Sequence, residues 1–177
     1  MEISLEQIRS NKLNIITEIT NPYPERFEIT HQLAELSHLP DGTDNIRAAG
    51  RITLIRKMGK LTFITIADIN GRIQAALKKD VIGEEQYDFF KKGFDIGDFI
   101  GVTGELFTTQ TGEKTIRVKE FQFLGKALRP LPEKFHGINN IDSCYRQRYL
   151  DLIMNEDTRK RFLASILPGS DTERLRD

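Results

Sequence analysis

Arg56, Phe63 and Gln74 combine three side-chain types that can bind single-stranded nucleic acid, and they lie in three successive strand-like segments. A phenylalanine ring exposed on a sheet can stack on a base, which contributes about 1–3 kcal/mol per base. An arginine can direct two N–H groups to a base carbonyl or a phosphate. A glutamine amide both donates and accepts, which suits the edge of a pyrimidine. In neighbouring strands these side chains could converge on one outer surface.

Each of these residues also has an ordinary structural interpretation. A strand phenylalanine is more often in the core, because its burial follows from hydrophobicity alone. Arg56 could be a hairpin charge, and Gln74 could be an unremarkable surface residue. The region also carries an excess of basic side chains over one acid, Asp68, which fits either a phosphate-binding patch or charged edge strands. The basic residues are Arg51, Arg56, Lys57, Lys60, Arg72, Lys78 and Lys79.

Five strand-like segments position these residues. They cover residues 47–57, 61–69, 72–78, 98–107 and 114–124. A helical segment over residues 83–92 separates the third strand from the fourth. Three strands, a helix and two strands are the element order of an OB-fold. We therefore predict a mainly β fold with flanking helices, in which residues 46–125 form a five-stranded OB-fold barrel.

Glycines and turn residues punctuate the predicted barrel. Asn70-Gly71 is the strongest hairpin signal in the chain, because both residues tolerate positive φ. Gly59 lies near the tip of the preceding hairpin. Gly101 and Gly104 lie inside the fourth strand, where glycine indicates a sharp bend or a close approach of another segment.

The flanking segments are expected to be helical or extended. Residues 1–45 predict an N-terminal extension of short helices, the second of which begins at a Thr30 cap. Residues 126–141 contain prolines and no periodicity, which indicates a linker. A long amphipathic helix is predicted from a cap at Asp142 to about Leu167.

Composition excludes several classes of protein. The 177 residues carry no formal net charge, which argues against a protein that coats nucleic acid nonspecifically. The single Cys144 excludes an internal disulfide framework and fits a reducing compartment. We expect a cytoplasmic protein without membrane contact, because the sequence has neither a long apolar run nor a secretory signal. The histidines 31, 38 and 136 are isolated, so no metal site and no catalytic residue are predicted.

Longer runs of the sequence resemble a known family. RITLIRKMGKLTFITIADINGRIQ, FKKGFDIGDFIGVTGELFTTQTGE and above all KALRPLPEKFHGINNIDSCYRQRYLDLI are similar to class II lysine–tRNA ligases. The resemblance covers about residues 22–162 and separates the chain from the aspartate and asparagine relatives, which share the barrel. It implies an anticodon-binding domain that reads the UUU-type anticodon of tRNA(Lys).

The resemblance also implies roles for four residues. Phe63 matches the base-stacking phenylalanine of the family, and Arg56 matches an arginine that contacts the central anticodon uridine. Gln74 matches a glutamine that reads the same base region. Glu113 matches a glutamate that contacts an end base of the anticodon, and only the resemblance identifies it. Where the family usually has a glutamine, this chain has Ala67, so we expect no polar contact from that position.

The resemblance further implies that residues 142–177 are the truncated start of a catalytic domain, since the segments that hold ATP and magnesium in the family are absent from the sequence. We expect a monomer or weak homodimer that binds the anticodon loop of tRNA(Lys) without catalysis and without a cofactor. Two alternatives stay open. The chain could be the first part of an intact ligase that charges tRNA(Lys) with lysine using ATP, or it could be a generic single-strand-binding barrel.

Overall fold

The computed structural model of the chain describes residues 4–130 and 145–166. The chain divides into two compact units, one ending at Pro130 and one beginning at Leu131. Among the described residues, the first unit contains five strands and four helices and the second contains two helices. The residues predicted to bind nucleic acid all belong to the first unit.

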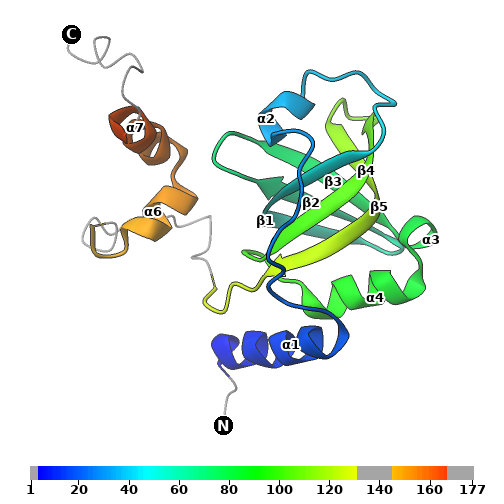
Figure 1. Cartoon of the computed structure of the whole chain (residues 1–177), viewed down its shortest axis with the longest axis horizontal. Coiled ribbons are helices and arrows are strands. Elements are labelled where there is room, and N and C mark those ends of the chain that lie inside the picture. Colours follow the sequence, from blue (N-terminus) through cyan, green and yellow to red (C-terminus); the bar gives the residue numbers. More distant parts are fainter. Residues whose placement is uncertain (1–3, 131–144, 167–177) are drawn as a thin grey trace. The chain divides into compact units, whose positions relative to one another are not determined.

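The five strands form a closed barrel (Figure 1). They are β1 (Ile46–Met58), β2 (Leu61–Ala67), β3 (Arg72–Lys78), β4 (Phe99–Thr108) and β5 (Lys114–Gly125). The order around the barrel is β1-β2-β3-β5-β4, in which β3 and β5 are parallel and every other neighbouring pair is antiparallel. The predicted OB-fold barrel with flanking helices is thereby confirmed.

Alternation along the strands separates the barrel core from its outer face. On β2, Thr62, Ile64 and Ile66 are buried, whereas Phe63 and Thr65 between them are partly exposed. The side-chain period of a strand is two, so a shift of one residue would exchange these two faces. The strands contribute the following buried apolar residues to the core: Ile46, Ala48, Ile52, Ile64, Ile66, Ile73, Ala75, Leu77, Ile100, Val102, Leu106, Ile116, Val118 and Phe123.

Four helices accompany the barrel. They are α1 (Leu5–Ile19), α2 (Leu33–Leu36), α3 (Lys79–Ile82) and α4 (Glu84–Gly93). Phe90 on α4 and the adjoining Phe94 are buried and pack on the core, so α4 covers one end of the barrel (Figure 1). Ile16 is the buried residue of α1, and it lies so close to Gly93 that an added Cβ there would be 3.2 Å from its side chain. The N-terminal helix therefore packs on the last turn of α4.

The short helix α2 does not begin at Thr30. Gln32 is its N-cap, and the backbone N–H of Gln32 donates to the carboxylate of Glu35 at 3.0 Å. The Thr30 hydroxyl instead accepts from the backbone N–H of Arg47 at 2.9 Å. The predicted cap is therefore wrong, because β1 uses the hydroxyl that would have capped the helix.

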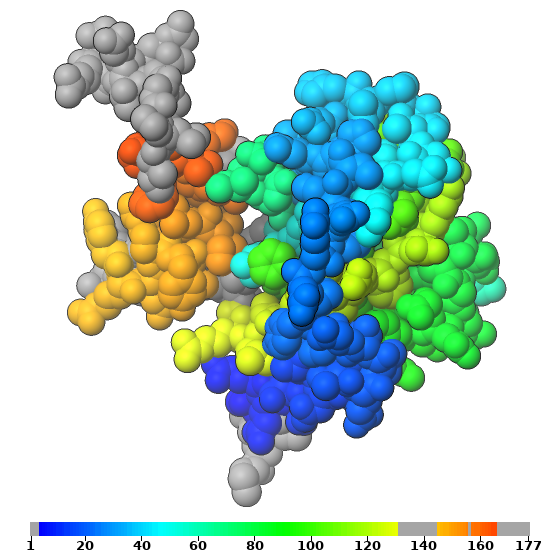
Figure 2. Space-filling model, viewed as in Figure 1, coloured from blue at the N-terminus to red at the C-terminus, as the bar shows by residue number. Residues whose placement is uncertain are grey.

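The segment between α1 and α2 lies across the outer side of the barrel (Figure 2). The ring of Phe27 lies on Gly101 of β4, where a Cβ would be 2.6 Å from the ring. The guanidinium of Arg47 on β1 lies 5.0 Å from the centroid of the same ring. This side of β1 and β4 is consequently covered by the chain itself.

The two predicted close approaches inside β4 are both observed. Besides the contact of Gly101 with Phe27, a Cβ on Gly104 would lie 2.1 Å from the carbonyl oxygen of Arg117. The register between β4 and β5 also shifts between Thr103 and Gly104. Glycine thus lets β4 press against β5 where the barrel bends.

The Asn70-Gly71 turn forms by a different mechanism from the predicted one. Neither residue has positive φ. The carboxylate of Asp68 instead accepts from the backbone N–H groups of both residues, each at 2.7 Å. A Cβ on Gly71 would lie 3.0 Å from the Cα of Ala34, so this glycine is needed for contact with α2.

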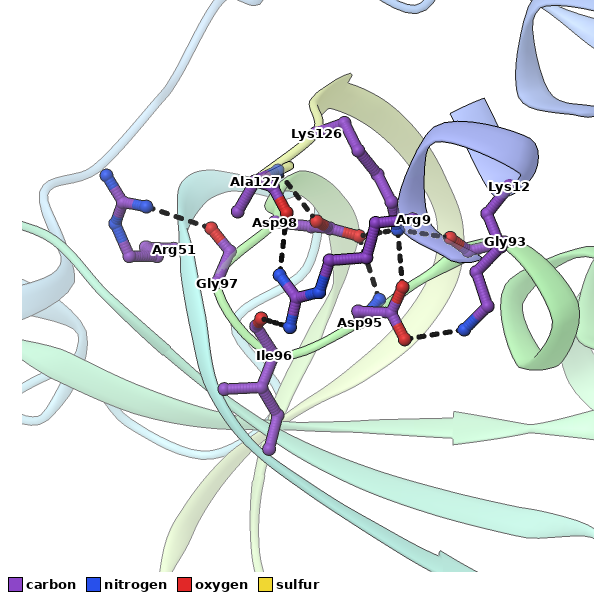
Figure 3. Close-up of polar contacts among 10 residues, drawn as sticks. All are labelled: Arg9, Lys12, Arg51, Gly93, Asp95, Ile96, Gly97, Asp98, Lys126 and Ala127. Atoms are coloured by element: carbon purple, nitrogen blue, oxygen red, sulfur yellow. Dashed lines mark hydrogen bonds and ion pairs between the residues drawn. The ribbon is translucent and has the colours of Figure 1, made fainter. Parts of the chain in front are cut away.

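A buried ammonium group lies just beyond the end of β5. The side chain of Lys126 is 0 % exposed, and its Nζ donates to the carbonyl of Gly93 and to the carboxylates of Asp95 and Asp98, each at 2.7 Å (Figure 3). All three ammonium hydrogens therefore have acceptors. The Asp98 carboxylate, also 0 % exposed, is paired in turn.

Helix α1 is tied to the same cluster. Lys12 donates to the other oxygen of Asp95 at 2.6 Å, and Arg9 donates to the carbonyl of Ala127 at 2.6 Å. The backbone N–H of Ala127 donates to Asp98 at 2.9 Å. The cluster therefore joins the N-terminal helix, the segment between α4 and β4, and the chain that leaves β5 (Figure 3).

The second unit contains a helix break where the sequence predicted one continuous helix. Its helices are α6 (Arg148–Met154) and α7 (Glu156–Ile166). At the break, the side-chain oxygen of Asn155 accepts from the backbone N–H groups of Asp157 at 3.1 Å and Thr158 at 3.3 Å. The predicted uninterrupted helix is wrong because Asn155 caps a new one. Its predicted cap, Asp142, lies outside the described residues.

Replacement of Lys126 by alanine is expected to destabilise the first unit strongly. It would leave the buried Asp98 carboxylate without its cation, and loss of one partner of a buried ion pair costs about 3–5 kcal/mol. Urea unfolding measures the change. The matched control is Lys119→Ala, because Lys119 forms an ion pair of the same length with Asp44 in a half-exposed position, and little change is expected there. Equal midpoints for the two variants would contradict the structural role of Lys126.

The free energy of unfolding is expected to decrease as the pH is lowered through the acid range. Burial would raise the pKa of Asp95, but hydrogen bonds from Lys12 and Lys126 outweigh burial and lower that pKa below its ordinary value. A lowered pKa stabilises the fold at neutral pH, and this contribution is lost as the pH falls below the ordinary aspartate value. Urea midpoints measured from pH 7 to pH 3 should decline more steeply for the parent than for Asp95→Asn. Parallel pH profiles would show that Asp95 does not contribute.

Candidate nucleic-acid interface

The outer face of β1, β2 and β3 brings Arg56 and Phe63 together. Arg56 on β1 lies directly opposite Phe63 on β2, and Phe63 lies opposite Ala76 on β3. Arg56 is exposed and Phe63 is partly exposed, so the ordinary core role of a strand phenylalanine does not apply here. Ala76 is buried, at 5 % exposed, between its register partners Phe63 on β2 and Arg117 on β5. The arrangement is a flat ring with a cation beside it.

Gln74 lies one residue pair along the same face. It is opposite Thr65 on β2 and opposite Thr115 on β5, and its side chain is nearly buried, at 8 % exposed. Its Nε2 donates to Oε2 of Glu113 at 2.7 Å, and its Oε1 accepts from the Thr115 hydroxyl at 2.9 Å. These two bonds fix the orientation of the amide. One N–H and one lone pair of the amide remain for a ligand.

Glu113 belongs to the ordered turn between β4 and β5. The Thr109 hydroxyl accepts from the backbone N–H of Glu113 at 3.0 Å, and the backbone N–H of Gly112 donates to the carbonyl of Thr109 at 2.9 Å. Gly112 has φ +82°, which favours glycine at this point of the turn. The turn thus holds the exposed Glu113 carboxylate against Gln74. The structure therefore joins two residues that lie 39 positions apart in the sequence.

Hydrogen bonds at the base of the same turn add rigidity. Asp41 accepts from Lys114 at 2.7 Å and from the Thr108 hydroxyl at 2.9 Å, and these bonds lower the pKa of the Asp41 carboxyl. Thr108 and Lys114, which flank the turn, are therefore both hydrogen-bonded to Asp41 in the segment that precedes β1. This arrangement limits movement of Glu113 relative to the barrel.

The outer face continues onto β5 and β4 with residues that the sequence analysis missed. Arg117 lies opposite Ala76 on β3 and opposite Glu105 on β4. Its guanidinium lies 4.8 Å from the centroid of the Phe107 ring and 3.6 Å from the Glu105 carboxylate. The strict alternation of the fifth strand could have indicated that Arg117 faces outward, but nothing in the sequence places it beside Phe107.

The predicted basic run does not form one patch. Arg51 donates to the carbonyl of Gly97 at 2.9 Å and lies 4.2 Å from the Phe99 ring, on another part of the barrel. Lys79 is hydrogen-bonded to Glu84, which raises the pKa of that lysine. Arg56 remains exposed opposite Phe63, and the exposed Arg117 lies on the other side of Ala76 from Phe63.

Ala67 lies at the end of β2, opposite Arg51 on β1 and Arg72 on β3. It provides no polar side-chain atom to the outer face, as expected.

Within residues 4–130 and 145–166, no helix is long and apolar enough to cross a membrane. The same residues contain no group of three or more His, Cys, Asp or Glu side chains that could hold a metal ion.

Comparison with known proteins identifies the barrel. Residues 46–124 match the model of an OB-fold nucleic acid binding domain. The chain is 44 % identical over 170 residues to a lysine–tRNA ligase of Thermosipho melanesiensis, a match that covers 89 % of this chain and 34 % of the relative. Lysine–tRNA ligases of Methanoculleus marisnigri and Azoarcus sp. are 47 % and 54 % identical over 77 % and 67 % of this chain, and over 27 % and 24 % of their own lengths.

The chain thus spans about a third of the length of the first of these relatives. The resemblance inferred from the sequence runs is confirmed by matches that extend from the barrel into both flanking segments. The chain is therefore a homologue of the lysine–tRNA ligases and carries an OB-fold nucleic acid binding domain at residues 46–124.

Proposed function

We propose that the outer face of β2 and β3 binds the anticodon loop of tRNA(Lys). In this proposal Phe63 stacks on one base, and Arg56 contacts the carbonyl or phosphate of the central uridine. Gln74 and Glu113 contact base edges. The observation that carries the proposal is the register, which sets Arg56 opposite Phe63 and brings the hydrogen-bonded pair Gln74–Glu113 one residue pair away.

The polar groups left at Gln74 and Glu113 suit a uracil edge. Uracil presents one N–H donor between two carbonyl acceptors, whereas cytosine presents an amino donor in place of one carbonyl. A carboxylate accepts only, and it keeps free lone pairs after the bond from Gln74. The remaining amide N–H of Gln74 can donate to a uracil carbonyl. In this proposal Gln74 supplies a donor for a carbonyl of the central uracil, and Glu113 supplies an acceptor for the N–H of a uracil at one end of the anticodon.

A second candidate is that this barrel works within a complete lysine–tRNA ligase that uses ATP to charge tRNA(Lys). The relatives are lysine–tRNA ligases about three times as long as this chain, and their similarity extends beyond the barrel. Lysine-dependent exchange of pyrophosphate into ATP, measured on the product of the intact gene, would test this candidate. The 177 residues themselves are proposed to bind tRNA(Lys) and not to catalyse its charging.

A cytoplasmic location of the protein is proposed as well, because tRNA(Lys) is its proposed partner.

Replacement of Phe63 by alanine is expected to weaken binding of a tRNA(Lys) anticodon stem-loop by about 5- to 150-fold, which corresponds to about 1–3 kcal/mol for one stacked base. Fluorescence anisotropy with a labelled stem-loop measures the change. The control is Phe99→Ala, because Phe99 is 40 % exposed on β4, opposite Arg51 and away from the proposed face. Equal losses in both variants, or none in either, would contradict the stacking role.

Replacement of Glu113 by glutamine is expected to reduce the preference for uridine over cytidine at one end of the anticodon. The amide oxygen of the new residue can still accept from Gln74, but its amino group can turn toward the base and accommodate cytosine. One well-matched polar pair is worth about 1–3 kcal/mol of discrimination between bases. Stem-loops that differ at single anticodon positions measure the preference. An unchanged preference at every position would show that Glu113 does not read a base.

A further inference from the structure

A second pair of a cation and an aromatic ring lies on the outer face, on β5 and β4. Arg117 on β5 is opposite Ala76, and its guanidinium carbon lies 4.8 Å from the centroid of the Phe107 ring on β4. Arg117 is exposed and Phe107 is partly exposed. Phe27 covers β4 only toward the other end of the strand, at Gly101. The proposed function leaves this second pair without a role.

The outer surface is continuous from Phe63 to Arg117. Ala76 faces outward, because Ala75 before it and Leu77 after it belong to the core. Ala76 is nevertheless only 5 % exposed, so the side chains on either side cover it. These register neighbours are Phe63 on β2 and Arg117 on β5. A strand of RNA that contacts Phe63 can therefore continue onto Arg117 without crossing a gap.

Thr115 connects Phe107 to the polar pair of the proposed site. It lies opposite Gln74 on β3 and opposite Phe107 on β4. The Thr115 hydroxyl donates to the Gln74 amide at 2.9 Å, and the Glu113 carboxylate accepts from the same amide at 2.7 Å. Across the strands, the Gln74 side chain therefore lies between two aromatic residues, Phe63 on β2 and Phe107 on β4.

The contacts of Arg117 favour a neutral, flat ligand over a phosphate. Its guanidinium lies over the Phe107 ring, and the Glu105 carboxylate lies 3.6 Å from one of its nitrogens. This carboxylate offsets the positive charge of the guanidinium and would repel a phosphate. The Arg117 side chain remains 48 % exposed, which leaves room for a planar group on the guanidinium. The bases of single-stranded RNA stack on arginine guanidinium planes as they do on aromatic rings.

The spacing across the strands separates this surface from that of Phe63. Arg117 and Phe63 are two strand spacings apart, which is about 10 Å. Successive bases stacked in a helical strand are only about 3.4 Å apart, so bases on the two surfaces would be splayed, as in bound RNA loops. Glu113 belongs to the turn that joins the strands of Phe107 and Arg117. The base that Glu113 contacts is therefore the one within reach of Arg117.

We propose that Arg117, held over Phe107, is the stacking surface for the end base of the anticodon whose edge Glu113 contacts. The inference rests on the proposed function, because it assumes that RNA occupies this outer face. Arg117 contacts the base directly, whereas Phe107 and Glu105 are positioning residues that hold the guanidinium. Stacking is tolerant of sequence, so Arg117 supplies affinity and fixes the plane of the base, and Glu113 supplies the selection.

The test compares the 177-residue parent with Arg117→Lys, which keeps the positive charge beside Glu105 and removes the planar group. Phe107→Leu removes the ring beneath the guanidinium and keeps an apolar side chain. The matched control is Arg26→Lys, because Arg26 forms an ion pair of the same length, 3.6 Å, with Glu28 in the N-terminal extension. Thermal unfolding confirms that all variants are folded.

Five RNAs are compared by fluorescence anisotropy over a range of salt concentrations. They are the anticodon stem-loop of tRNA(Lys), the same stem-loop with its central uridine changed to cytidine, and three stem-loops that each lack one anticodon base. The abasic RNAs show which base each side chain contacts, because a variant that removes a contact with a base has no effect once that base is absent.

Arg117→Lys is expected to weaken binding of the complete stem-loop by about 5-fold or more, which is the lower limit for loss of one stacked base. The slope of log affinity against log salt should not change, because the charge is kept. The loss should vanish with the stem-loop that lacks one end base and persist with the one that lacks the central base. Phe107→Leu should show the same dependence with a smaller loss, and Arg26→Lys should bind as the parent does.

The results separate this inference from the proposed function. If the parent prefers the central uridine but Arg117→Lys keeps the parent's affinity, or loses it equally with every abasic RNA, the stacking surface is wrong and the proposed function stands. Cancellation by the missing central base would likewise overturn the assignment to the end base. If the parent shows no preference but one missing end base cancels the loss, anticodon reading is wrong and the stacking surface stands. Absence of RNA binding by the parent would refute both.

Discussion

The fold depends on the neutralisation of Asp98, a carboxylate buried where α4 gives way to β4. Its charge is stabilised by the Lys126 ammonium at 2.7 Å and by the backbone N–H of Ala127 at 2.9 Å. Both donors come from the chain that has just left β5. The same ammonium reaches Asp95, which Lys12 of α1 also holds. Burial of an uncompensated charge is costly, so helix α1, the end of α4 and the exit of β5 must assemble together.

This arrangement divides the barrel into a structural side and an open side. The N-terminal extension covers β1 and β4 through Phe27. The ion pairs of Lys126 with Asp95 and Asp98 lie where the end of α4 meets α1 and the chain that leaves β5. The outer face of β1, β2 and β3 keeps Arg56 and Phe63 accessible, and a fixed turn bounds it at each end. The Asp41 and Thr109 bonds hold one turn and the Tyr87 hydroxyl holds the other. The residues that could contact RNA are therefore supported by elements that do not touch it.

Strand alternation and the order of the elements were enough to predict the barrel, because a period of two is a local property of the sequence. The strand order also showed that Arg56 and Phe63 could converge on one outer surface, because their strands are neighbours. Alternation cannot predict contacts between segments that are distant in the sequence. Examples are the hydrogen bond between Gln74 and Glu113 and the contact of the Arg117 guanidinium with the Phe107 ring. The two wrong predictions of helix ends share one cause, which is that the side chains involved can form more than one kind of hydrogen bond with the backbone. Thr30 bonds to β1 instead of capping a helix, and Asn155 caps a helix in the middle of a periodic run.

Lys126 lies outside the residues that match the family model, yet it neutralises two aspartates that lie inside them. The matched domain ends at residue 124, so it excludes Lys126, and it begins at residue 46, so it excludes Lys12. A polypeptide cut at those boundaries would retain both aspartates and lose both lysines that neutralise them. A segment that keeps both aspartates neutralised extends from helix α1 through Ala127, so a barrel grafted into another protein needs these two flanks to retain its buried ion pairs.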